Sequence, residues 1–287
     1  MARPLRIEYP GALYHITSRG NARQKIFISD IDRKAFLDLL DTTIKRYRWI
    51  CYAYCLMDNH YHLVIETPEG NVSRGMRHLN GVYTQKYNWH NKKTGHVFQG
   101  RFKAILVDKD SYLLQLCRYV LLNPIRAKTV DHPEKWRWSS YRQLIGKEKP
   151  SDFLTIDWIL GQFSHKKRDA QKLFEGFVIE GIRGDSLWKN LKGQIFLGEK
   201  GFIEQCKKIM YTHDILHEIP RSQRFVFRPP LEDLFPDEIR KDRKKRNDAL
   251  YDACIQYGYT LKEVADFLGI HYTTVSNIIR NHSKDKN

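Results

Sequence analysis

The chain has 287 residues, which is enough for one large domain or for two to three smaller ones. It carries 49 Lys and Arg against 33 Asp and Glu, a formal charge of +16, while 41% of its residues are hydrophobic. This balance excludes an intrinsically disordered chain and favours a folded protein with a polyanionic partner. Charge alone does not distinguish DNA, RNA and an anionic membrane, and a basic surface can also serve solubility only.

The expected compartment is the cytoplasm, with association to the nucleoid. The N-terminal residues lack the apolar run of a signal peptide, and no stretch approaches the ~18 apolar residues that span a bilayer. Five cysteines are an odd number without a C-x-x-C pair. Cys51 and Cys55 lie about 13 Å apart if their segment is extended, so we expect reduced, mostly buried thiols.

The first predicted elements are a strand and a helix. Residues 12–18 favour β-structure between Pro10-Gly11 and Gly20-Asn21. Ser29 and Asp32 form an S-x-x-D helix start, and apolar residues recur behind it at helical spacing to about Arg48.

A hairpin and two further helices are predicted next. Residues 49–57 and 60–66 read as strands around the turn Asp58-Asn59. A helix over 72–87 follows, then a loop over 91–100 and a strand over 102–107. Asp108 or Asp110 starts a third helix to Asn123, where Pro124 should stop it.

This order of elements predicts an α+β fold. Strand, helix, strand, strand, helix, strand and helix describe a ferredoxin-like antiparallel sheet with helices packed on it, over residues 5–145. Residues 146–239 should be mainly helical, over 154–163 and 170–182, with a Pro-rich loop or linker over 220–236. The charge run 240–246 begins a separate C-terminal unit, residues 240–287.

His60 and His62 are the first candidate site. Side chains at i and i+2 of a strand share a face, so both imidazoles project together while Tyr61 and Leu63 point to the other side. Neutral imidazole is a common metal ligand, but two histidines rarely bind tightly without a third ligand. An H-x-H pattern is also frequently structural.

The third helix offers Tyr119 and Asn123, four residues apart and therefore on one face. A phenolate can attack a DNA phosphate, and the resulting phosphotyrosine conserves the bond for later rejoining. A divalent metal on His60, His62 and the Asn123 amide oxygen would keep positions open for phosphate oxygens. Mg²⁺ or Mn²⁺ suits so labile a site.

The order of motifs resembles a known family. Residues 57–64, MDNHYHLV, resemble the His-hydrophobic-His signature of HUH nucleases, and residues 119–127, YVLLNPIRA, resemble the tyrosine helix of Y1 transposases. Residues 14–21 and 98–102 match further, so the resemblance covers roughly residues 5–145. The subgroup most resembled is that of REP-associated, IS200-like tyrosine transposases.

The resemblance implies a metal-dependent single-strand DNA endonuclease and strand transferase of the transposition type. It implies one catalytic tyrosine, Tyr119, a 5′-phosphotyrosine intermediate and recognition of hairpin-forming DNA ends. Insertion-sequence members of the wider family commonly use glutamine one turn after the tyrosine, whereas this chain has Asn123, as REP-associated members do.

Three residues beside the predicted sheet have two interpretations each. Arg101 and Lys103 would hold phosphates of the cut strand or be solvated surface. His15 lies on the strand expected next to the metal strand, where it would contact DNA or be a satisfied buried histidine, and we place it outside the metal site.

The C-terminal unit contains a second DNA-binding candidate. Apolar residues between Leu261 and Ile279, with Gly269 at a tight turn, match a helix-turn-helix and resemble DnaA C-terminal-like and transposase-associated domains. Polar residues would line the exposed side of its second helix: Thr273, Thr274, Ser276, Asn277 and Arg280. A plain helical hairpin is the alternative.

The sequence thus predicts an enzyme acting on single-stranded or hairpin DNA, with duplex DNA as a further partner of the C-terminal unit. One alternative is a non-catalytic DNA-binding regulator derived from a transposase. Another is an HUH replication initiator or relaxase, which usually carries larger or helicase-linked domains. The monomeric or dimeric state is left open.

Overall fold

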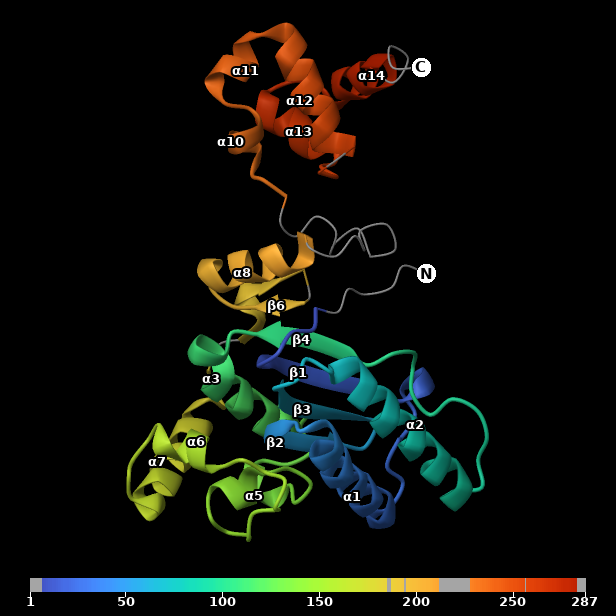
Figure 1. Ribbon diagram of the computed structural model, residues 1–287, viewed down its shortest axis with the longest axis vertical. Coiled ribbons are helices and arrows are strands. Elements are labelled where there is room, and N and C mark those ends of the chain that lie inside the picture. The colour runs from blue at the N-terminus through green and yellow to red at the C-terminus, as the bar shows by residue number, and fades with distance from the viewer. Residues whose placement is uncertain (1–6, 185–186, 194, 212–227, 256, 283–287) are drawn as a thin grey trace. The chain divides into compact units, whose positions relative to one another are not determined.

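The computed structural model describes residues 7–184, 187–193, 195–211, 228–255 and 257–282 (Figure 1). They form two compact units, and each is described by itself: the first spans residues 6–212 and the second contains the described residues from 228 onward. No helix among the described residues is long and apolar enough to cross a bilayer. All five cysteines are free, and Cys51 and Cys55 are buried.

The first unit is built on a sheet in the order β2-β3-β1-β4-β6-β5. Its first four strands are β1 (Ala12–Arg19), β2 (Ile50–Met57), β3 (His60–Thr67) and β4 (Lys103–Val107), all antiparallel to their neighbours. Together with α1 (Asp30–Tyr47) and α2 (Val72–His90) they complete a ferredoxin-like arrangement, as predicted. The α+β fold class is confirmed.

Local signals explain these elements. Ser29 caps α1 in a capping box with Asp32, and Arg48 closes the helix in the left-handed conformation. The apolar stripe of α1 packs on the sheet, where the Phe36 ring lies 4.7 Å from that of Tyr61 on β3. Tyr61 also donates to Asn80 of α2 at 2.5 Å. Helices α1 and α2 therefore cover the sheet face that carries Tyr61.

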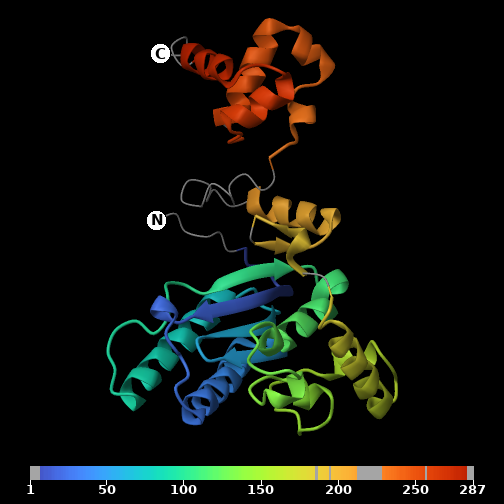
Figure 2. The same ribbon diagram turned by 180° about the vertical axis from the view of Figure 1, so that it is seen from behind.

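The opposite face of the sheet is covered by α3 (Lys109–Leu121), which contacts β2 and β3 (Figure 2). The helix ends two residues before the predicted end. Asn123 begins a separate short turn, α4 (Asn123–Arg126), with Pro124 near its start, where a missing N–H costs nothing. Asn123 thus lies just beyond the tyrosine helix and not within it.

Residues after 145 belong to the same unit, so the structure has no boundary at the predicted position. The helices α6 (Asp157–Gly161) and α7 (Lys167–Glu180) agree with the predicted helical stretches, and η3 (Leu187–Asn190) and α8 (Lys200–Tyr211) follow. Two short strands were not predicted. Of these, β6 (Phe196–Leu197) pairs in parallel with β4, and β5 (Leu191–Lys192) pairs with β6.

Two shorter elements, η2 (Pro133–Lys135) and α5 (Tyr141–Leu144), precede these additions, and a third, η1 (Asn21–Arg23), lies between β1 and α1. Isolated bridges link Cys55 to Ser139 and Cys51 to Leu154. The Ser140 hydroxyl also accepts from the Tyr54 backbone N–H at 3.0 Å. The chain beyond residue 135 is therefore fastened along the free edge of β2.

The second unit is helical, with α10 (Leu231–Leu234), α11 (Asp237–Lys241), α12 (Arg243–Ile255), α13 (Leu261–Leu268) and α14 (Tyr272–His282). Its core is formed by side chains of α12, α13 and α14 and of the segments that precede α11 and α13: Phe235, Leu250, Ala253, Tyr259, Val264, Ala265 and Val275. Because Phe235 is fully buried there, the unit begins before the predicted residue 240. Residues 220–227 of the predicted linker lie outside the described residues.

Candidate active site

The site face of the sheet carries two histidines at one end of β3. His60 pairs with Arg19 of β1, and His62 pairs with Thr17. Directly opposed residues of antiparallel strands point to the same face, so Arg19 joins the histidines there. The rings of His60 and His62 lie 4.9 Å apart, as the i, i+2 spacing predicted.

Each histidine uses its Nδ1 atom within the protein. The Nδ1 of His60 lies 2.7 Å from the side-chain oxygen of Asn59. The Nδ1 of His62 lies 2.9 Å from Nε2 of His15, and the two rings are coplanar with centroids 5.1 Å apart. That geometry is an edge-to-edge hydrogen bond rather than a stack. Both Nε2 atoms therefore remain for another partner.

Burial keeps these imidazoles neutral. Desolvation lowers the pKa of His15 to about 3, and desolvation with the nearby charge of Arg19 lowers the pKa of His60 to about 4. Desolvation first, then the neighbouring histidines and Arg19, lowers the pKa of His62 well below its usual value. The neutral form, which ligates metals, is the form present at neutral pH.

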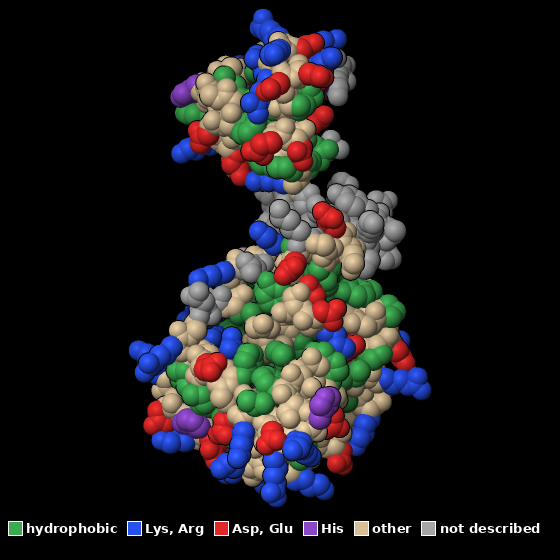
Figure 3. Space-filling view, turned by 90° about the vertical axis from the view of Figure 1, so that its left-hand side faces the viewer, with side chains coloured by type: hydrophobic (Ala, Val, Ile, Leu, Met, Phe, Trp, Pro, Cys, Tyr) green, Lys and Arg blue, Asp and Glu red, His purple; other side chains and the backbone are tan. Residues whose placement is uncertain are grey.

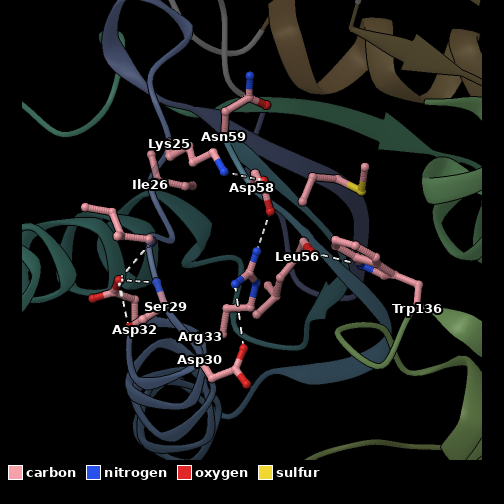
Figure 4. A network of polar contacts seen from close by, with 12 residues as sticks. Lys25, Ile26, Ser29, Asp30, Asp32, Arg33, Leu56, Asp58, Asn59 and Trp136 are labelled. Carbon is pink, nitrogen blue, oxygen red and sulfur yellow. Dashed lines mark hydrogen bonds and ion pairs between the residues drawn. The ribbon is translucent and has the colours of Figure 1, made fainter. Parts of the chain in front are cut away.

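The turn that precedes His60 is held by a polar network (Figure 4). Asp58 forms ion pairs with Lys25, at 3.0 Å, and with the nearly buried Arg33. Its backbone oxygen accepts from Ile26 N–H at 2.9 Å, and the Asn59 amide donates to a backbone oxygen of η1 at 3.1 Å. Asn59, whose side-chain oxygen lies beside His60, is thus held in place through its amide nitrogen.

Tyr119 reaches the histidines from α3. Its ring lies 5.8 Å from that of His15 and 6.2 Å from that of His62. The guanidinium of Arg126, on α4, lies 4.7 Å from the centre of the tyrosine ring. Trp188, on η3, contacts Tyr119 edge to face at 4.8 Å and lies 5.2 Å from His15.

Asn123 is tied to the end of the tyrosine helix. Its amide nitrogen donates to the Tyr119 backbone oxygen at 2.9 Å and to that of Val120 at 3.3 Å. Among the described residues its amide oxygen has no hydrogen-bond partner, and Asn123 forms no hydrogen bond with either histidine. Its predicted role as third ligand stays a prediction.

The residues present fit a divalent metal. The Nε2 atom of His62 is buried without a hydrogen-bond partner in the described part of the chain, which costs free energy unless a ligand occupies it. In those same residues no set of three His, Cys, Asp or Glu side chains is placed to hold a metal. Further ligands would then have to be amide, phosphate or water oxygens, which Mg²⁺ and Mn²⁺ accept.

Of the other predicted residues, Lys103 pairs with Thr17 on β1, which in turn pairs with His62, so it lies in one row with that histidine on the site face. Arg101 is exposed just before β4. The predicted DNA-binding residues of α14 all lie exposed in the second unit: Thr273, Thr274, Ser276, Asn277 and Arg280.

Sequence reasoning missed four neighbours of the site. His15 was placed outside the metal site, yet it forms the hydrogen bond to His62. Asn59 was read only as a turn residue, and Arg126 only as part of a motif. Trp188 lies in the region to which no chemistry was assigned. The i+2 alternation of His15, Thr17 and Arg19 was the available signal, since it puts them on one face.

Comparisons with known proteins agree with this description. Residues 9–122 match the family model described as "Transposase IS200 like". A Haemophilus influenzae protein described as "Putative REP-associated tyrosine transposase" is 24% identical over an alignment of 149 residues, and the match covers 48% of this chain and 84% of that protein.

A solved structure titled as a REP-associated tyrosine transposase bound to a REP hairpin is also similar. It has a TM-score of 0.45 and 16% identity, covering 55% of this chain and 91% of that one. Over residues 9–122, the chain is therefore similar to the IS200-like transposases.

Proposed function

We propose that the first unit cuts and rejoins single-stranded DNA at hairpin-forming ends, with Tyr119 as the nucleophile. One observation carries the proposal: the Tyr119 ring lies within 6.2 Å of the buried pair His15–His62, and the buried Nε2 atom of His62 has no hydrogen-bond partner among the described residues. A phenol beside an unfilled ligand atom is the combination that phosphotyrosine chemistry needs.

In the proposed reaction the Tyr119 oxygen attacks a phosphorus of the DNA backbone. The P–O bond to the 3′ side breaks, which leaves a 5′-phosphotyrosine on the protein and a free 3′-hydroxyl. Attack by a 3′-hydroxyl reverses the step and rejoins a strand. Arg126, 4.7 Å from the ring centre, and Arg19 on the site face each offer a cation to the phosphate.

We further propose that the Nε2 atoms of His60 and His62, with the Asn123 oxygen, hold Mg²⁺ or Mn²⁺. When bound, the ion would polarise the phosphate and stabilise charge on the leaving oxygen. Asn59 and His15 are positioning residues for this ligand pair. If each accepts the Nδ1–H of its histidine, each directs the lone pair of Nε2 outward.

The test is a covalent-adduct assay with labelled hairpin oligonucleotides and Mn²⁺, resolved on a denaturing gel. Tyr119→Phe should abolish the adduct, because phenylalanine has no oxygen to attack with. Tyr112→Phe, on the same helix, is the matched control and should retain it. Adducts that persist in Tyr119→Phe would refute the assignment of the nucleophile.

We propose that α13 and α14 of the second unit bind duplex DNA as a helix-turn-helix. Gly269 joins them at φ +66°, a left-handed conformation that favours glycine, and Thr260 caps α13 in a capping box with Glu263. The exposed face of α14 is polar and basic, as base edges and phosphates require. Arg280→Ala should weaken duplex binding, whereas exposed Lys262→Ala on α13 should weaken it less.

The same assays test the non-catalytic regulator. Duplex binding that depends on Arg280, together with no adduct from the unaltered protein on any hairpin substrate, would favour the regulator over the enzyme. Adduct formation that needs both Mn²⁺ and Tyr119 would exclude it.

A further inference from the structure

Residues 70–107 carry no acidic side chain. The chain as a whole has about two acids for every three bases, yet this stretch of α2, the following loop and β4 holds only cations. They are Arg74, Arg77, Lys86, Lys92, Lys93, Arg101 and Lys103. An unbroken run of one sign, placed on one continuous piece of structure, creates a local positive field stronger than the net charge alone implies.

These cations are exposed and lack acidic partners. In the part of the chain that the structure describes, none of the seven forms an ion pair, although cations on the adjoining helices do. Lys45 of α1 pairs with Asp41 at 2.8 Å, and Lys109 of α3 pairs with Glu66 at 2.8 Å. The charge of residues 70–107 is therefore left for an external anion.

The outward face of α2 adds an aromatic platform. Arg74, Arg77, Gly81, Gln85 and Trp89 recur at helical spacing on the side away from the buried tyrosines of this helix. The Trp89 side chain is 85% exposed, and a Cβ placed on Gly81 would meet open space. Arg74 and Trp89 are about 22 Å apart along the helix axis at ~1.5 Å per residue.

The loop after α2 connects this face to the site. Asn21 N–H donates to the Val97 oxygen at 2.9 Å, and Gln99 N–H donates to the Arg19 oxygen at 2.8 Å. Since Arg19 is also the strand partner of His60, the loop pairs with the end of β1, and β1 alone separates it from the His60 end of β3. After the loop, Lys103 of β4 pairs with Thr17 of β1, which is also the strand partner of His62.

We propose that the outward face of α2 and the loop over residues 91–102 bind single-stranded DNA. Cations along this surface would contact phosphates, and Trp89 would stack on an unpaired base. A base inside a duplex is already stacked on its neighbours, so an exposed indole favours a single strand over a duplex. An anionic membrane fits less well, because a lipid surface requires an apolar helix face and this one has a single large apolar side chain.

One part of this inference rests on the proposed function: that the strand bound on this surface is the continuation of the strand cut at Tyr119. Binding itself does not require cleavage. It can be measured in a Tyr119→Phe background with chelator present, using a fluorescein-labelled single strand of about 20 nucleotides and the matching duplex. Fluorescence anisotropy over a range of salt concentrations then gives the affinity and its salt dependence.

Two triple variants distinguish binding by this surface from nonspecific attraction by the overall positive charge. Arg74→Gln/Arg77→Gln/Lys92→Gln removes three cations from the surface. Lys167→Gln/Arg168→Gln/Lys172→Gln removes three exposed cations from α7. This helix contains both acidic and basic residues, and it lies on the side of the molecule shown in Figure 3. The first variant should reduce the slope of log affinity against log salt for the single strand by about 2, and the second should leave it unchanged.

Trp89→Ala should weaken single-strand binding at least about fivefold and duplex binding less, while Trp89→Phe should retain most of the affinity. Equal losses in both triple variants would overturn the proposal, because a nonspecific field would then account for binding. A loss confined to the duplex would also overturn it.

The adduct assay distinguishes this inference from the proposed function. If the α2 variant loses single-strand affinity while no variant with an intact Tyr119 forms an adduct, the surface stands and the proposed reaction fails. If adducts form and the α2 variant binds the single strand normally, the reaction stands and the surface fails.

Discussion

Replacing His15 with phenylalanine keeps an aromatic ring beside Tyr119 and Trp188 but removes the nitrogen that lies 2.9 Å from Nδ1 of His62. The Nδ1 atom of His62 then faces an apolar ring, and His62 is only 6% exposed. Two changes follow. The His62 ring loses its fixed orientation. Without an acceptor at Nδ1, the His62 proton can also move to Nε2, the nitrogen that would bind the metal.

Loss of such a partner typically weakens metal binding 10- to 100-fold, which corresponds to about 1.4–2.8 kcal/mol. Calorimetric titration of the protein with Mn²⁺ should show this for His15→Phe. His15→Gln should recover part of the loss, because its amide oxygen can accept the same hydrogen. His90→Phe, an exposed histidine on α2, is the control and should bind Mn²⁺ as the unaltered protein does.

A structural role alone would not move the tautomer of His62. Nitrogen NMR of the metal-free protein should find the proton on Nδ1 of His62 and detect protonated Nε2 in His15→Phe. Unchanged Mn²⁺ affinity in His15→Phe, or a proton on Nε2 in the unaltered protein, would refute the reasoning. Thermal unfolding of each variant checks that the fold is intact.

Three further perturbations test the fold around the sites. Gly75→Ala would place a Cβ 2.0 Å from the indole of Trp49 and should destabilise the protein by about 1–3 kcal/mol in denaturant unfolding. On the same helix, the Cβ of Gly81→Ala would meet no other atom, so this variant should stabilise the protein by up to about 1 kcal/mol. Asp58→Asn should cost about 1–3 kcal/mol in the same measurement, because the guanidinium of Arg33, whose side chain is 9% exposed, loses the nearer of its two charged partners, Asp58 and Asp30. Burial opposes ionisation of Glu263, but capping hydrogen bonds and a neighbouring guanidinium lower its pKa to about 2 from an ordinary 4.5. Its contribution to stability is therefore present above about pH 4.5 and lost as the pH falls through 2; hydrogen exchange of α13 should show this loss, and Glu263→Gln should not.

The strands and helices of the first 125 residues were predictable because each is long enough to show its period. The alternation along β3 placed His60 and His62 on one face, and the four-residue spacing placed Tyr119 towards them. The end of α3 was misplaced by two residues because proline is tolerated in the first turn of a new helix as well as after an old one.

The contacts missed are those that join distant parts of the chain. His15 and His62 are 47 residues apart, and no local pattern indicates that a third imidazole will bond to the second. The strands β5 and β6 have two residues each, too few for any periodic signal. Their pairing with β4 depends on an edge that exists only after the main sheet has formed.

That late addition to the sheet also sets when the site is complete during synthesis. The ferredoxin-like strands, both histidines and the tyrosine have all been made by residue 119, but Trp188 and the strands that follow it come about 70 residues later. A nascent chain that stops short of residue 188 has Tyr119 without the indole that contacts it. A segment cut after residue 145 would therefore lack both the indole that contacts Tyr119 and the two strands that extend the sheet, whereas a segment that runs through β6 would include them.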